Sequence, residues 1–203
     1  MEYLLLGFIT GLSLILAIGA QNIFVIEQGL KKQHIFLVCL VCSLSDLILI
    51  FLGIFLFHYF IQYFNSIIEL TLNILLIMFL IHFIYSKIKI YNSSIKLNDQ
   101  SQAISKLNIL LKTFGFTYLN PHVYSDTVFF LGNFSKNFLI NEKINFGLGA
   151  AISSFLFFFL IGYLSKYFSK FAENDKVWKI INTFIIIFMS LLTLFIILDT
   201  FIS

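Results

Sequence analysis

Two aspartates fall inside stretches of sequence that are otherwise apolar. Asp46 follows His34 by 12 residues. Asp126 lies 14 residues after Lys112 and 10 residues before Lys136. At the helical rise, each carboxylate would lie about 15–21 Å from the polar ends of its stretch. An ionisable residue at that depth costs at least about 2.5–3.5 kcal/mol on membrane-insertion scales, so both aspartates are functional candidates. For Asp46, a packing role with a hydrogen bond to a hydroxyl of a neighbouring helix is the structural alternative.

The second aspartate belongs to the stretch LNPHVYSDT, residues 119–127. Pro121 removes a backbone donor and clashes with the carbonyl four residues earlier, which predicts a broken or kinked helix. Asn120 can cap a new segment that has Pro121 at its first position. Such an end would carry unpaired N–H groups and a positive dipole, which attract an anionic group. His122 precedes Asp126 by four residues and could pair with it. An ordinary kink and a hydrogen-bonded interhelical histidine are the alternatives.

A third polar group is GAQN, residues 19–22. Gln21 would lie about 9 Å from the lysine-rich end of its apolar stretch, and Asn120 about 12 Å from the same end of its own stretch. Because the depths match, we expect Gly19, Gln21, Asn22 and Asn120 to line a cavity open to the cytoplasm, with the aspartates deeper. Amides that join helices by hydrogen bonds are the alternative.

The elements that position these residues are membrane-spanning helices. Of the 203 residues, 60% are hydrophobic and only 11% are charged, far from the quarter that is typical of soluble domains. Six apolar stretches are each near or above the roughly 20 residues that a spanning helix requires. They run over residues 3–26, 35–60, 66–86, 108–134, 144–165 and 178–201. The first lacks a basic leader and a small-residue cleavage site, so we expect a retained helix.

The basic residues predict the orientation of these helices. All are lysines, and all but Lys136 and Lys143 lie in the connections that follow the first, third and fifth apolar stretches or within a few residues of them. By the positive-inside rule those connections face the cytoplasm, which leaves both termini outside. If the first stretch is not a full span, the N-terminus lies inside instead. The net charge of +3 calls for no nucleic-acid partner.

A weak internal repeat suggests that the two halves of the chain are related. A shift of 109 residues lays LNILLIMF (72–79) on INTFIIIF (181–188), and residues 45–53 on 154–162. Three spans followed by three more must be inserted in the opposite direction, as in many secondary transporters. The sequence therefore predicts an all-α integral membrane protein with six transmembrane helices in a 3+3 inverted repeat. The single transmembrane domain, 1–203, would comprise halves 1–86 and 108–203, joined by a lysine-rich loop, 87–107.

Other chemistry finds little support in the sequence. Cys39 and Cys42 form CLVC inside the second stretch. Residues three apart on a helix meet poorly as a thiol pair, so small residues at a helix contact are favoured over a thiol-disulfide carrier. We find no ligand set with metal spacing, phosphate loop or nucleophile signature, and we predict neither an enzyme nor a cofactor.

Three stretches carry a resemblance to a known family: GAQNIFVIEQGL (19–30), LVCSLSDLILI (40–50) and LNPHVYSDT (119–127). In order and spacing they resemble the lysine/arginine exporter (LysE-type) family of amino acid efflux proteins, near its arginine-exporter branch. The resemblance implies a multi-pass protein of the bacterial cytoplasmic (inner) membrane that exports basic L-amino acids. It also implies functional roles for the motif residues, which are Gly19, Gln21, Asn22, Asp46, Asn120, Pro121, His122 and Asp126. The resemblance does not decide whether lysine or arginine is preferred, or whether the protein is a homo-oligomer.

The expected mechanism is exchange of the amino acid for protons. The two aspartates would hold the cationic groups, and the amides with the half-helix end would hold the carboxylate and α-ammonium. Moving a net +1 outward against an inside-negative potential costs about 2.3 kcal/mol per 100 mV, which favours coupling to protons. Efflux of another small cation, such as a metal ion, is the runner-up, and a thiol carrier comes third.

Overall fold

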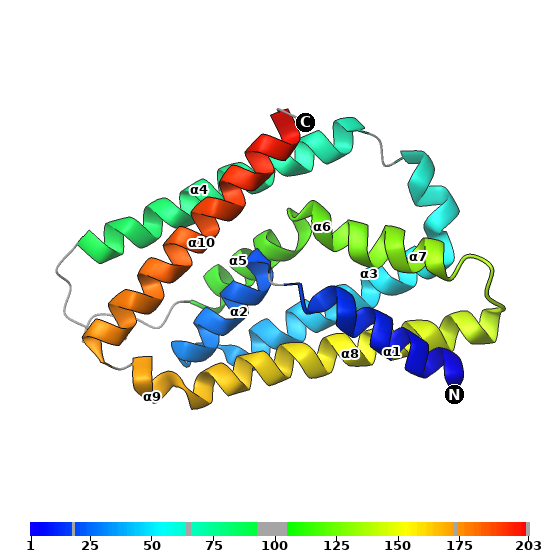
Figure 1. The fold of residues 1–203 in the computed structure, drawn as a ribbon, viewed down its shortest axis with the longest axis horizontal. Coiled ribbons are helices and arrows are strands. Elements are labelled where there is room, and N and C mark those ends of the chain that lie inside the picture. Colours follow the sequence, from blue (N-terminus) through cyan, green and yellow to red (C-terminus); the bar gives the residue numbers. More distant parts are fainter. Residues whose placement is uncertain (18, 64–65, 93–104, 173, 202–203) are drawn as a thin grey trace.

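The computed structural model describes residues 1–17, 19–63, 66–92, 105–172 and 174–201, and within these ranges it contains helices and no strands. The elements follow the chain in the order shown in Figure 1. The first half contains α1 (Glu2–Ile15), α2 (Ala20–Leu30), α3 (Ile35–Tyr63) and α4 (Ser66–Asn92). The second half contains α5 (Lys106–Tyr118), α6 (Pro121–Tyr124), the π-helix η2 (Ser125–Phe130), α7 (Leu131–Phe134), α8 (Ile140–Tyr167), α9 (Ser169–Ala172) and α10 (Asp175–Phe201).

Four of these helices are long and apolar enough to cross a membrane, namely α3, α4, α8 and α10. The pair α1–α2 meets the same test jointly, but it is bent by 83°. The described part of the chain therefore has four candidate spans, or five if the bent pair is one span. The predicted all-helical membrane class is confirmed, whereas the six spans of the sequence analysis are not.

The first apolar stretch is broken, and our expectation of one continuous helix was wrong. α1 ends at Ile15 and α2 begins after Gly19. Both arms lie against α8, since a Cβ atom at Gly7 would collide with the carbonyl of Phe146 and one at Gly29 with the carbonyl of Gly162. Those contacts are 16 residues apart, so the bent pair follows about 24 Å of α8. That length is most of a hydrocarbon core of about 30 Å.

The fourth apolar stretch is also broken, as Pro121 predicted. α5 ends at Tyr118, and a new helical segment begins at Pro121. This stretch runs beside α3: the Tyr118 hydroxyl donates to Ser45 Oγ at 2.9 Å, and Gly132 packs against the backbone of Gly53. The π-helix over Ser125–Phe130 was not foreseen in the sequence.

The helix ends that flank the lysine-bearing connections gather at one end of the bundle. The ends of α2, α4 and α8, together with α9 and the start of α10, lie on the left of Figure 1, away from the N-terminus. The predicted loop 87–107 is wrong at its start, because α4 continues to Asn92 and Lys87 is a buried helical residue. Residues 93–104 of that loop lie outside the described residues.

The packing of α3 against α8 confirms the predicted role of the small residues in the second stretch. Cys39 and Cys42 are fully buried free thiols, and Cys39 Sγ donates to the Phe158 carbonyl at 3.2 Å. The space for Cys39 exists because residue 162 is glycine, whose absent Cβ would lie 2.6 Å from the sulfur. These contacts favour helix packing over thiol exchange.

Candidate functional site

A cavity of about 350 Å³ lies where the two helix breaks face each other. Its volume is at the lower end of the range typical of small-molecule sites. Seven of the eight residues proposed from the sequence line it, and only Pro121 does not. The seven are Gly19, Gln21, Asn22, Asp46, Asn120, His122 and Asp126.

Asp46 lies in the middle of α3 and is 6% exposed. The Ser154 hydroxyl of α8 donates a hydrogen bond of 2.7 Å to Asp46 Oδ2. This bond is the one that the structural alternative for Asp46 requires. The same carboxylate and the same serine also line the cavity, so the bond orients an acidic group at its wall.

Asp126 lies in the first turn of η2 and is half-buried, and His122 is more exposed. The Thr127 hydroxyl donates to the Val123 carbonyl at 2.5 Å within the same segment. His122 and Asp126 line the same cavity without a hydrogen bond or ion pair between them, so the predicted pairing is not formed here. π-bulges are frequent at functional sites because they re-aim side chains within a helix.

The Asn120 cap is confirmed, with a consequence that the sequence did not reveal. Asn120 Oδ1 accepts the His122 N–H at 3.1 Å, and Pro121 occupies the first helical position. The Val123 N–H donates to the Asn120 carbonyl at 3.2 Å. Pro121 has no N–H, so the first donors of α6 are already paired. Our expectation of unpaired N–H groups at this helix end was therefore wrong.

The N-terminus of α2, by contrast, has no side-chain cap among the described residues. Gly19 is its N-cap residue and provides no side chain to cap the first turn. Gln21 is 6% exposed, and its Nε2 is a buried donor without a hydrogen-bond partner among the described residues. Asn22 Nδ2, by contrast, donates to the carbonyls of Ile15 and Ala17 at 3.0 and 3.1 Å. Asn22 thus holds the break together, as the packing alternative for these amides predicted.

The cavity extends away from the lysine-rich end, which differs from the expected cytoplasmic opening. Its lining includes Gly11 of α1, Leu131 of α7 and Ile196 of α10. On the lysine-rich side the stacked rings of Phe24 and Phe116 follow, with centroids 4.7 Å apart and both side chains almost fully buried. The two buried rings thus lie between the cavity residues of α2 and α5 and the lysine-rich ends of these helices.

Sequence reasoning missed two features around this site. Ser154 was noted only within a weak repeat, and its contact with Asp46 requires α3 and α8 to meet. Glu27 was given no role from the sequence, yet it is 1% exposed and bridged to Lys31 and Lys87. The spacing of Glu27 and Lys31, four residues apart, was the available signal.

The described residues contain no group of three or more histidine, cysteine, aspartate or glutamate side chains that could hold a metal ion. The acidic groups at the cavity are the pair Asp46 and Asp126. A carboxylate pair with amide donors suits an organic molecule that carries charges of both signs.

A family model described as LysE type translocator matches residues 12–200. The chain belongs to this family. It is also similar to a putative amino-acid transporter YggA of Aeromonas hydrophila, with 34% identity over 139 residues that cover 65% of this chain and 59% of the relative. An arginine exporter protein ArgO of Pectobacterium carotovorum is 33% identical over 141 residues, which cover 65% of each chain.

An ArgO of Salmonella newport is 34% identical over 142 residues, or 65% of this chain and 63% of the relative. The chain thus spans less than two thirds of the length of the curated relatives it matches. No solved structure matches it significantly. As a LysE type translocator with several apolar helices, it is a multi-pass protein of the bacterial inner membrane.

Proposed function

We propose that this LysE type translocator exports basic L-amino acids, arginine or lysine, from the cytoplasm in exchange for protons. The observation that carries the proposal is that one cavity is lined by Asp46, Asp126 and Gln21, whose Nε2 has no hydrogen-bond partner among the described residues. A basic amino acid carries an α-ammonium, a carboxylate and a cationic side chain. Two acidic groups and one donor region match that set of charges.

The two ends of the substrate would bind different walls. The unpaired Nε2 of Gln21 and the positive N-terminus of α2 would hold the carboxylate. Asp46, oriented by Ser154, and Asp126 would hold the cationic groups. Asn120, Pro121 and His122 position Asp126, since they set where the second part of the broken helix starts.

Protons would complete the cycle. Once the substrate has left, two carboxylates without a counter-charge are unfavourable in a low dielectric, and protons can supply that charge on the return. Outward movement of a net +1 against about 100 mV costs about 2.3 kcal/mol, so inward protons would also provide the driving force.

The arrangement of helices supports six spans in two related halves, 1–86 and 108–203, within one domain. The broken pair α1–α2 runs parallel to α8, and the broken stretch α5–α7 runs parallel to α3. α3 packs on α8, and α4 packs on α10. Exchange of the halves would turn the first of the two parallel contacts into the second and would leave the α3–α8 and α4–α10 contacts as they are, as in an inverted repeat. Alternating access would then rock one half against the other.

Reconstitution in liposomes tests the function directly. The measurement is flux of labelled arginine and lysine with and without an imposed proton gradient. We expect gradient-dependent flux in the wild type, and none with Asp46→Asn or Asp126→Asn although both variants insert. Full transport by the double variant would refute the proposal. For the metal-ion alternative, an exporter-deficient strain is grown with and without this gene. Its resistance to a toxic arginine analogue and its tolerance of metal ions are then compared between the two.

A further inference from the structure

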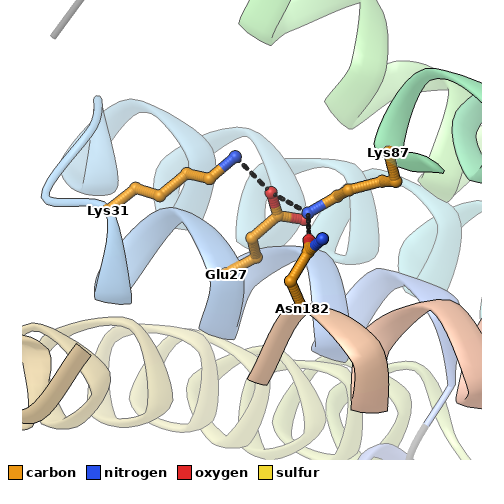
Figure 2. Close-up of polar contacts among 4 residues, drawn as sticks. All are labelled: Glu27, Lys31, Lys87 and Asn182. Carbon is orange, nitrogen blue, oxygen red and sulfur yellow. Dashed lines mark hydrogen bonds and ion pairs between the residues drawn. The ribbon is translucent and has the colours of Figure 1, made fainter. Parts of the chain in front are cut away.

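A buried ionic cluster joins three helices on the lysine-rich side of the cavity. Glu27 Oε1 of α2 lies 2.5 Å from both Lys31 Nζ and Lys87 Nζ, and Lys87 Nζ also donates to Asn182 Oδ1 of α10 at 3.2 Å (Figure 2). The side chains of Glu27 and Lys87 are 2% and 8% exposed, whereas that of Lys31 is 23% exposed. Lys87, from α4, is therefore the buried partner, and Lys31 is the outer one.

The cluster lies directly beyond an aromatic layer, formed by the rings of Phe24, Phe83 and Phe116, on the lysine-rich side of the cavity. Gln21, Phe24 and Glu27 follow one another at intervals of three residues along α2, which is about 4.5 Å per step. Phe83 likewise precedes Lys87 by one turn of α4, and its ring lies 5.0 Å from that of Phe116. A substrate that passes from the lysine-rich end to Gln21 must therefore pass Glu27 first.

The charges of the cluster are not balanced as a structural ion pair would be. Two ammonium groups share one oxygen of Glu27, while Oε2 is buried and has no hydrogen-bond partner in the described part of the chain. A buried acceptor without a donor is unfavourable, and buried ion pairs contribute little net stability. A guanidinium would fill both oxygens with two parallel N–H bonds, and a primary ammonium would replace Lys87 like for like.

We propose that Glu27 is a second binding site for the exported cation, on the lysine-rich side of the aromatic layer, and that Lys87 occupies it as a tethered competitor in this conformation. This inference rests on the proposed export of basic amino acids. When the ends of α2, α4 and α10 separate, the substrate's cationic side chain displaces the Lys87 ammonium from Glu27. One positive charge replaces another, so the charge beside Glu27 is unchanged throughout the exchange.

A purely structural tie between helices makes a different prediction. If the ion pair only holds the helices together, removal of either partner has the same effect on transport. If Lys87 competes with substrate, removal of Glu27 weakens substrate binding and removal of Lys87 strengthens it. The sign of the change in KM therefore separates the two roles.

The test measures arginine transport in inside-out membrane vesicles, which expose the lysine-rich face, and in right-side-out vesicles. We expect Glu27→Gln to raise KM at the lysine-rich face at least tenfold, with a change below twofold at the other face. Lys87→Met is expected to lower that KM several-fold. Lys31→Met is the matched control, because Lys31 contacts the same Glu27 oxygen but is more exposed. It is expected to change KM by less than twofold.

Lys87→Arg covers the case in which Lys87→Met does not fold, because it keeps a buried cation. Its guanidinium would hold both oxygens of Glu27, so KM at the lysine-rich face should rise. Shifts of the same sign for Glu27→Gln and Lys87→Met, or a fall in KM with Lys87→Arg, would overturn the inference. A KM of Glu27→Gln within twofold of the wild-type value would also overturn the inference, while the proposed export function would stand. If the wild type carries neither arginine nor lysine, the proposed function itself fails.

Discussion

The hydroxyl of Ser154 donates a 2.7 Å hydrogen bond to the carboxylate of Asp46, and so connects the middle of α8 to the middle of α3. Both residues line the cavity. The two longest helices, α3 and α8, are thus joined by a polar bond at the candidate site. The position of one acidic group therefore depends on the contact between the two halves of the chain.

Ser154→Ala should weaken arginine binding without loss of the fold. The Asp46 carboxylate would lose a donor, and a hydrogen bond to a charged group contributes about 1.5–3 kcal/mol, so the affinity should fall by about tenfold or more. Ser153→Ala is the matched control, because Ser153 donates to the Ala150 carbonyl of its own helix and does not line the cavity. Equal effects of the two variants on the dissociation constant, measured with labelled arginine, would argue against this role for Ser154.

Close packing of α1 on α8 should make Gly149 sensitive to a single added methyl group. A Cβ there would collide with the backbone carbonyl of Leu4, so Gly149→Ala should lower the free energy of unfolding by about 1–3 kcal/mol. Gly19→Ala should leave thermal unfolding in detergent unchanged, since nothing lies within 4 Å of its added Cβ and its φ is an ordinary −114°. A stable Gly149→Ala protein would contradict the observed contact.

The side chain of Asn120 should matter as a helix cap. Asn120→Ala leaves the His122 N–H without its acceptor and should destabilise the protein by about 1 kcal/mol. Asn120→Ser keeps an acceptor and should recover most of that loss. Thermal unfolding of both variants in the same detergent tests this order, and an alanine variant as stable as the serine variant would exclude capping.

Cys39 and Cys42 should be dispensable for transport. Both thiols are fully buried and free, so neither should react with a maleimide in the folded protein. The double variant Cys39→Ser and Cys42→Ser should retain arginine export, because both positions serve helix packing. Cys39→Leu should fail to fold well, since the sulfur already fills the space beside Gly162. Loss of export in a well-folded double serine variant would revive the thiol-carrier hypothesis.

Local signals in the sequence were sufficient for part of the site. Asn-Pro at 120–121 predicted a broken and capped helix because proline and its preceding residue act within one turn. The depth of Asp46 and Asp126 in apolar stretches identified both as candidates because burial of a charge is costly wherever it occurs. Such effects depend on residues a few positions apart, so they can be read without a fold.

Tertiary contacts decided the rest. The break before Ala20 has no proline, and Asn22 holds it by donating to carbonyls at the end of α1. Glu27 reads as an ordinary helix-end carboxylate until Lys87, which is distant in the chain, is brought against it. By itself, the sequence determined the membrane class and which polar residues are costly to bury. Only the packing of α2, α4, α8 and α10 decided which of those residues share a cavity and which are already paired, because hydrogen bonds and ion pairs form between neighbours in space.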